Sequence, residues 1–158
     1  MSGGNDGRNP ADHDAATSGR AERSPAADSR FPGDSARFDA GMAVRREVLG
    51  DEHVDRANVG IDEFTADFQD MITRTAWGEI WTRSGLDRRM RSAITMTALI
   101  AGGHMDELGM HVRAALRNGL TPDEIKEVLL QSAIYCSVPS ANSAFKIAQP
   151  IIAEAREQ

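Results

Sequence analysis

The apolar residues of this chain recur at three-and-four spacing from residue 37 onward, without the strict alternation of a half-buried strand. This pattern is typical of amphipathic helices and predicts an all-α domain over residues 37–158. The predicted helices cover about residues 39–49, 51 onward, 61–74, 77–81 (a short helix or turn), 87–101, 105–118, 121–135 and 139–157.

Capping residues support two of the predicted helix starts. Asp87 directly precedes an apolar helical run and is placed to cap it. Thr121 is followed by Pro122 and, three positions on, by Glu124, the arrangement of a capping box with proline at the first helical position. Gly119 marks the end of the preceding helix, because glycine readily adopts the left-handed conformation.

The apolar residues of three predicted helices indicate which of their faces are buried. The helix over 61–74 predicts one buried stripe, and the helix over 87–101, apolar on nearly every side, predicts a central position. The last helix has a seam of mostly small residues that could serve a subunit interface or ordinary packing within the chain. The stripe consists of Ile61, Phe64, Phe68, Met71 and Ile72, and the seam of Ala141, Ala144, Phe145, Ala148, Ile151 and Ile152.

Residues 1–36 have a different composition from the rest of the chain. They are rich in Gly, Pro, Ser, Ala, Asp and Arg, contain almost no large apolar residues and show no periodicity. Such a segment cannot bury enough apolar surface to fold, and we predict a disordered leader. The remaining residues, 37–158, are enough for one domain with its own core.

Charge and cysteine content exclude several classes of protein. The net charge of −6 and pI near 5.2 argue against a nucleic-acid binder and against membrane-surface binding. The single cysteine, Cys136, excludes an internal disulfide. No apolar run approaches the roughly 18 residues of a membrane span, and the N-terminus lacks the apolar core of a signal peptide. We therefore expect a cytoplasmic protein.

The most suggestive residues for chemistry are Glu107 and His111. Residues four apart on a helix share one face, so the carboxylate can orient and polarise the imidazole. A histidine with such a partner can exchange protons with a ligand near neutral pH. A structural ion pair has the same spacing, so spacing alone leaves both interpretations open. The chain has no HExxH pattern, and we predict no metal site.

Several motifs stand in order along the chain. They are residues 38–42, 44–46, 48–51 and 53–56, 74–83 (RTAWGEIWTR), Gly85-Leu, Arg91-Ser, 107–115 (ELGMHVRAA), Asn118-Gly, 124–128 (EIKEV) and 131–136 (QSAIYC). Together these motifs resemble the 4-carboxymuconolactone decarboxylases, and the resemblance covers the chain from about residue 38 to 151.

The resemblance implies an all-α fold shared with alkylhydroperoxidase-D-like proteins, and a ring-shaped homo-oligomer, a hexamer or trimer. It also implies decarboxylation, without metal or organic cofactor, of 4-carboxymuconolactone to 3-oxoadipate enol-lactone, in the protocatechuate branch of the β-ketoadipate pathway. The peroxidase relatives use a CxxC followed by a histidine. Here Glu107 stands in place of the second cysteine while His111 is kept, and Ser137 follows Cys136 where relatives usually have glycine.

Residue roles follow from this implied reaction. We expect His111 to donate the proton and Glu107 to orient it. The candidate contacts to the substrate are Arg46, Arg83 and Arg91 as carboxylate anchors, Tyr135 as a hydrogen-bond donor and Trp77 as an apolar wall. Two alternatives stay open: a peroxide reductase that uses Cys136, and a non-catalytic helical oligomeric binding protein.

Overall fold

The computed structural model describes residues 35–157, and nearly all of the predicted disordered leader lies outside the described residues. This part of the chain is helical and contains no strand, which confirms the predicted all-α class. The helices are α1 (Ser35–Leu49), α2 (Asp51–Val59), α3 (Ala66–Ile72), the π-helix η2 (Thr73–Ile80), α4 (Arg88–Gly102), α5 (Met105–Arg117), α6 (Pro122–Tyr135) and α7 (Val138–Arg156).

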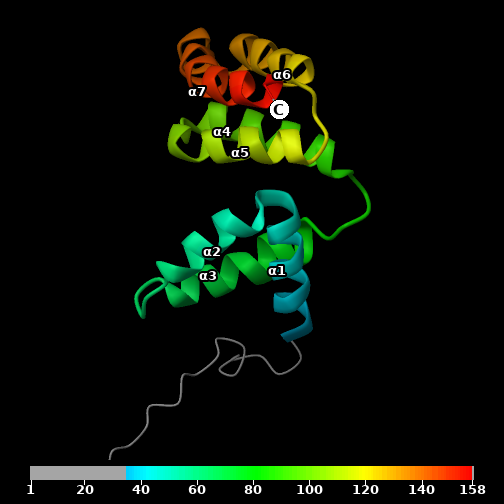
Figure 1. Cartoon of the computed structure of the whole chain (residues 1–158), viewed down its shortest axis with the longest axis vertical. Helices are drawn as coiled ribbons and strands as arrows, with labels where there is room; N and C mark the ends of the chain where they lie inside the picture. The colour runs from blue at the N-terminus through cyan, green and yellow to red at the C-terminus, as the bar shows by residue number, and fades with distance from the viewer. Residues whose placement is uncertain (1–34, 158) are drawn as a thin grey trace, which may run out of the picture.

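The helices form two groups joined by the connection between η2 and α4 (Figure 1). In one group α1 packs along η2, and in the other α4 lies against α5, α6 and α7, which confirms its predicted central position. The larger buried cluster belongs to α4–α7 and includes Met96, Ile100, Leu108 and Leu129. None of the helices between residues 35 and 157 is long and apolar enough to cross a membrane.

Helix α5 lies in the group of α4–α7 and also packs against the other group. Leu108 and Val112 face the larger cluster, whereas Ala114 joins the smaller cluster of Val48, Leu49, Val54 and Trp77 from α1, α2 and η2. Helix α5 therefore lies where the two groups meet.

The contact between α1 and η2 depends on two glycines. A Cβ atom built on Gly41 would lie 2.2 Å from the carbonyl oxygen of Thr73, and one on Gly78 would lie 2.3 Å from that of Arg37. Both distances are far below van der Waals contact, so only glycine allows the two backbones to approach this closely. The apolar periodicity does not predict the π-helix, since it does not distinguish this rare winding from an α-helix.

Both predicted helix starts are confirmed. Asp87 accepts a 2.7 Å hydrogen bond from the Met90 amide at the start of α4. At α6 the Thr121 hydroxyl accepts from the Glu124 amide at 3.2 Å, and the Glu124 carboxylate accepts from the Thr121 amide at 2.8 Å. These contacts satisfy backbone donors that a helix N-terminus otherwise leaves open.

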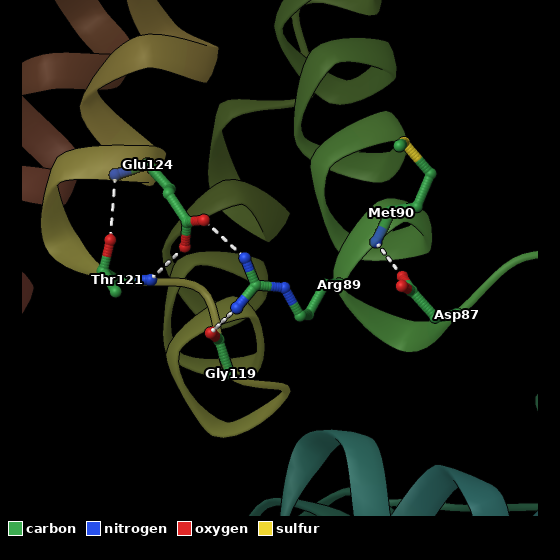
Figure 2. Close-up of polar contacts among 6 residues, drawn as sticks. All are labelled: Asp87, Arg89, Met90, Gly119, Thr121 and Glu124. Carbon is green, nitrogen blue, oxygen red and sulfur yellow. Dashed lines mark hydrogen bonds and ion pairs between the residues drawn. The ribbon is translucent and has the colours of Figure 1, made fainter.

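Arg89 links these two helix starts (Figure 2). Its Nη1 donates to the carbonyl oxygen of Gly119 at 2.6 Å, and its Nη2 forms an ion pair with Glu124. The same carboxylate therefore caps α6 and holds the first turn of α4 beside the turn that precedes α6.

The prediction of one buried helix over residues 61–74 is wrong. Asp62 and Thr65 hydrogen-bond to each other through side chain and backbone, and α3 begins only at Ala66. Such side-chain bonds offer the backbone an alternative to the helix. The expected stripe is largely open in the single chain, with Phe64 93% exposed and Phe68 57% exposed.

Two further observations concern the first and the last helix. Helix α1 begins at Ser35, four residues before the predicted start. In α7, Ala141, Ala144 and Ala148 are buried within the chain, so ordinary packing accounts for the small-residue seam.

Candidate active site

Glu107 and His111 lie one turn apart on α5, beside the buried face formed by Leu108 and Val112. His111 is half-buried and Glu107 is exposed. Burial and the positive charge of His53 lower the pKa of His111, and the Glu107 carboxylate opposes them by raising it. Glu107 thus acts on the imidazole through its charge, as the helical spacing predicted.

His53 is a neighbour that the sequence interpretation missed. It is half-buried on α2, and it lies close enough to His111 for its charge to lower the pKa of His111. Its own pKa is lowered by burial and by the charges of Arg45, Arg56 and Arg117. Two histidines from separate helices therefore share one electropositive region.

Arg45 is the other residue that was missed. This side chain is only 5% exposed, and its Nε and Nη1 atoms are buried without a hydrogen-bond partner among residues 35–157. Burial, and then the charge of Arg46, lower its pKa. Among residues 35–157 the guanidinium has no acidic partner, and its charge lowers the pKa of His53.

Arg46, the predicted anchor, faces a different environment. Its two terminal nitrogens bond Asp51 at 3.1 Å and Asp55 at 2.7 Å, and these hydrogen bonds raise its pKa. The side chain therefore ties α1 to α2. Of the two adjacent arginines, Arg45 is the one that lacks an acidic partner within residues 35–157.

Trp77 contributes an apolar surface to the same region. It is 8% exposed and packs with Val48, Leu49 and Val54 in the smaller cluster. Its ring centroid lies 5.3 Å from that of Trp81. The smaller cluster includes residues of α1, α2 and α5. These helices also carry Arg45, His53 and His111, so these three polar side chains border an aromatic and aliphatic core.

The other predicted contacts are not brought to this group. Arg91, in the first turn of α4, donates from Nη2 to the carbonyl oxygen of Arg83 at 3.0 Å. Tyr135 is 79% exposed at the end of α6. None of these three is among the charges that shift the pKa of His53 or His111.

Two grooves also lie apart from it. One runs between α4 and α6 and the other between α6 and α7, and neither is lined by Arg45, His53, Glu107 or His111. Cys136 is a half-buried free thiol at the end of α6. Within residues 35–157, no three His, Cys, Asp or Glu side chains gather as metal ligands would.

The group of Arg45, His53, Glu107 and His111 has the chemistry of an anion site with an acid. The buried arginine gives it positive charge, and the one carboxylate can stabilise the protonated form of an imidazole whose pKa is lowered by burial. Such a site can attract a carboxylate and supply a proton to it or to its product.

Comparisons with known proteins agree with this chemistry. The chain is 45% identical over 118 residues to the 4-carboxymuconolactone decarboxylase of Acinetobacter baylyi, covering 75% of this chain and 88% of the relative. It is 44% identical to the nitrosuccinic acid decarboxylase npaB of Metarhizium robertsii, covering 73% and 80%. A 4-carboxymuconolactone decarboxylase sequence from Pseudomonas putida is 58% identical over 43 residues, which are 27% of this chain and 90% of that sequence.

A family profile matches as well. The profile described as the carboxymuconolactone decarboxylase family spans residues 66–150, from α3 into α7. Together with the identity over most of the A. baylyi enzyme, this match shows that the chain belongs to the carboxymuconolactone decarboxylase family.

Proposed function

We propose that this chain decarboxylates 4-carboxymuconolactone to 3-oxoadipate enol-lactone, in the protocatechuate branch of the β-ketoadipate pathway. The observation that carries the proposal is the 45% identity to a 4-carboxymuconolactone decarboxylase over 88% of that enzyme. The buried guanidinium of Arg45 near His53 supports it, because the substrate is a dicarboxylate.

The substrate itself can accept the electrons released by decarboxylation. Its carbon–carbon double bond is conjugated to the lactone carbonyl. The electron pair of the breaking bond to CO2 can therefore spread through this double bond onto the carbonyl oxygen of the lactone. A proton must then be delivered to carbon to complete the product. The enzyme has to bind two carboxylates, stabilise the developing oxyanion, weaken the hydration of the departing group and supply that proton.

His111 suits the last task and Glu107 assists it. A protonated His111 donates to carbon, and the charge of Glu107 favours the protonated form against the effects of burial and of His53. Trp77 gives the site an apolar wall, at which a carboxylate loses part of its hydration. Arg46, Arg83, Arg91 and Tyr135 are not part of this group and stay predicted substrate contacts, to be tested by replacing each and measuring KM for the lactone.

The decisive experiment follows the ultraviolet absorbance of freshly made carboxymuconolactone together with CO2 release. The full chain should consume the lactone with matching CO2, and His111→Ala should lose about 10²- to 10⁴-fold in turnover, as for a general acid. His104→Ala is the matched control, because His104 is exposed just before α5. A folded wild-type protein without turnover would reject the function, and an unimpaired His111→Ala would reject the acid.

A second candidate substrate is nitrosuccinic acid. It is supported by the 44% identity to the M. robertsii nitrosuccinic acid decarboxylase over 80% of that protein. The nitro group would accept the electrons that the lactone carbonyl accepts in the first reaction. Comparing kcat/KM for the two substrates decides between them, and we expect the lactone to be preferred.

We also propose that the chain works as a homo-oligomer in the cytoplasm. Large apolar side chains remain exposed in the single chain, among them Phe64, Phe68, Met71, Ile94, Ile134, Tyr135 and Val138. Phe64, Phe68 and Met71 lie within one short segment of the chain, and contiguous exposed apolar surface marks protein–protein contacts. A reducing cytoplasm suits the lone thiol of Cys136.

Sedimentation tests the assembly. The wild-type chain should sediment as a trimer or hexamer, and the double variant Phe64→Asp with Phe68→Asp should shift towards smaller species, since it places charges in an apolar contact. The exposed Glu157→Lys serves as the control. A monomeric wild-type chain at working concentration would contradict the proposed assembly.

A further inference from the structure

Arg45 is a buried cation in the apolar stripe of α1. The buried positions of this helix are Gly41, Arg45, Val48 and Leu49, which share one face at helical spacing. Two nitrogens of the Arg45 guanidinium are closed to solvent and make no hydrogen bond with residues 35–157. An unpaired buried charge is strongly unfavourable, and its retention in a core stripe points to a ligand that completes it.

The surrounding charges favour an anion as that ligand. The Arg45 charge acts on His53, and the His53 charge acts on His111. The aspartates that follow α1 in the chain, Asp51 and Asp55, pair with Arg46. Arg45 is left without a counterion in the part of the chain that the structure describes.

We propose that Arg45, with His53 beside it, forms a carboxylate-binding subsite that holds the carboxylate group the substrate keeps after CO2 has left. The identity of the substrate rests on the proposed function. The subsite suits both candidate substrates, since the lactone keeps its acetate arm and nitrosuccinic acid keeps its second carboxylate. Arginine is suited to the role because its planar group binds carboxylates through several donors.

The choice of the retained carboxylate has a physical reason. In the transition state the negative charge of the departing carboxylate is moving into the ring. A cation at that carboxylate would therefore stabilise the substrate more than the transition state, which would slow the reaction. A cation at the retained carboxylate contacts a charge that does not change. It orients the substrate, and its energy lowers the barrier by fixing the reacting carbon beside His111.

The wild-type chain gives the first test. Succinate, an unreactive dicarboxylate, is titrated into the full chain while the imidazole signals of His53 and His111 are followed by NMR against pH. A bound carboxylate should raise the pKa of both histidines, because it adds negative charge to their surroundings. Equal ionic strength of sodium chloride should not reproduce the effect. Unchanged titrations in saturating succinate would overturn the subsite.

Variants give the second test. Arg45→Met should weaken succinate binding and raise the KM for the lactone about 10- to 100-fold, as expected for loss of hydrogen bonds to a charged group. Arg45→Lys should retain part of the binding. Arg113→Met is the control, because Arg113 lies exposed on α5 with only a 3.6 Å ion pair to Glu154.

Stability separates this role from a structural one. Removal of an unpaired buried charge should leave the Tm of Arg45→Met equal to or above that of the wild type. A large loss of stability in Arg45→Met, together with wild-type succinate binding in Arg45→Lys, would assign Arg45 to the fold and overturn the subsite.

The outcomes also separate the subsite from the proposed function. Arg45-dependent succinate binding in a chain that turns over neither substrate would support the subsite and reject the function. Normal turnover with unchanged KM and succinate binding in Arg45→Met would reject the subsite alone.

Discussion

Glu107 influences the protonation of His111, the proposed acid. Burial and His53 both favour the neutral imidazole, and the Glu107 carboxylate counteracts them. Three nearby effects therefore set the pKa of His111, and with it the fraction of protonated imidazole. Substitution of Glu107 alters one of them.

Replacing Glu107 by Gln should shift the pH dependence of the reaction. In the wild type, kcat/KM should rise as pH falls through the pKa of His111, which lies below its ordinary 6.5. Glu107→Gln removes the charge that raises this pKa, so the rise should move to lower pH and activity at pH 7 should fall. Asp106→Asn, an exposed neighbour on the same turn, should leave the profile in place. A profile that does not move in Glu107→Gln would refute the electrostatic role.

The adjacent arginines show what residue-level interpretation of the sequence can and cannot give. The family resemblance includes both Arg45 and Arg46, but of the two only Arg46 was among the three predicted anchors, with Arg83 and Arg91. A signal for the other residue is present in the sequence, because Arg45 stands four positions after Gly41 and three before Val48, in the buried stripe. His53 carries no such signal, since its proximity to His111 depends on how α2 meets α5.

At the scale of elements, the π-helix η2 holds Trp77 in the smaller cluster, and its contact with α1 combines side-chain packing with a close approach of the two backbones. Gly41 is the closest point of that contact, with Gly78 opposite it. The spacing leaves no room for a methyl group.

Gly41→Ala should therefore destabilise the protein. The new Cβ would lie 2.2 Å from the Thr73 carbonyl oxygen and 2.8 Å from the Gly78 amide nitrogen, and neither backbone atom can move alone. Overpacking of this kind costs about 1–3 kcal/mol or more, which urea unfolding can measure. Gly85→Ala is the matched control, because a Cβ atom added there would have no neighbour within 4 Å. Equal stability of the two variants would contradict the close contact.

Elements were predictable where their signals are local. The caps at Asp87 and Thr121 act within one turn, and both helix starts lie where the sequence indicated. The stripe of Phe64 and Phe68 could not be placed in the same way. Apolar spacing predicts that a face will be covered, but it does not say whether the cover comes from this chain or from another.

At the scale of the whole molecule, the site lies where the two helix groups meet. Arg45 and His53 come from α1 and α2, and Glu107 and His111 come from α5, which packs in both buried clusters. Folding therefore brings positive groups together as the two groups of helices dock. The assembled site should make stability depend on pH.

The free energy of unfolding should fall as pH decreases through the range in which these histidines titrate. Folding lowers the pKa of both His53 and His111 below the ordinary value of 6.5, so between the two values the unfolded chain binds protons that the folded chain does not. The histidines' contribution to stability is thus present above pH 6.5 and is lost as pH falls through the folded values. The lowered carboxyl pKa values of Asp62 and Glu124 start from 3.8 and 4.5, so their effect lies at lower pH.

Urea unfolding between pH 5 and 8, at constant ionic strength, measures this dependence. His53→Asn and His111→Asn should each flatten it, and the double variant should flatten it most, because each substitution removes one group that gains a proton on unfolding. His104→Asn should leave the slope as it is, since His104 is exposed and lies outside the site. A wild-type protein that becomes more stable as pH falls from 7 to 5.5 would show that the histidines do not share an electropositive region.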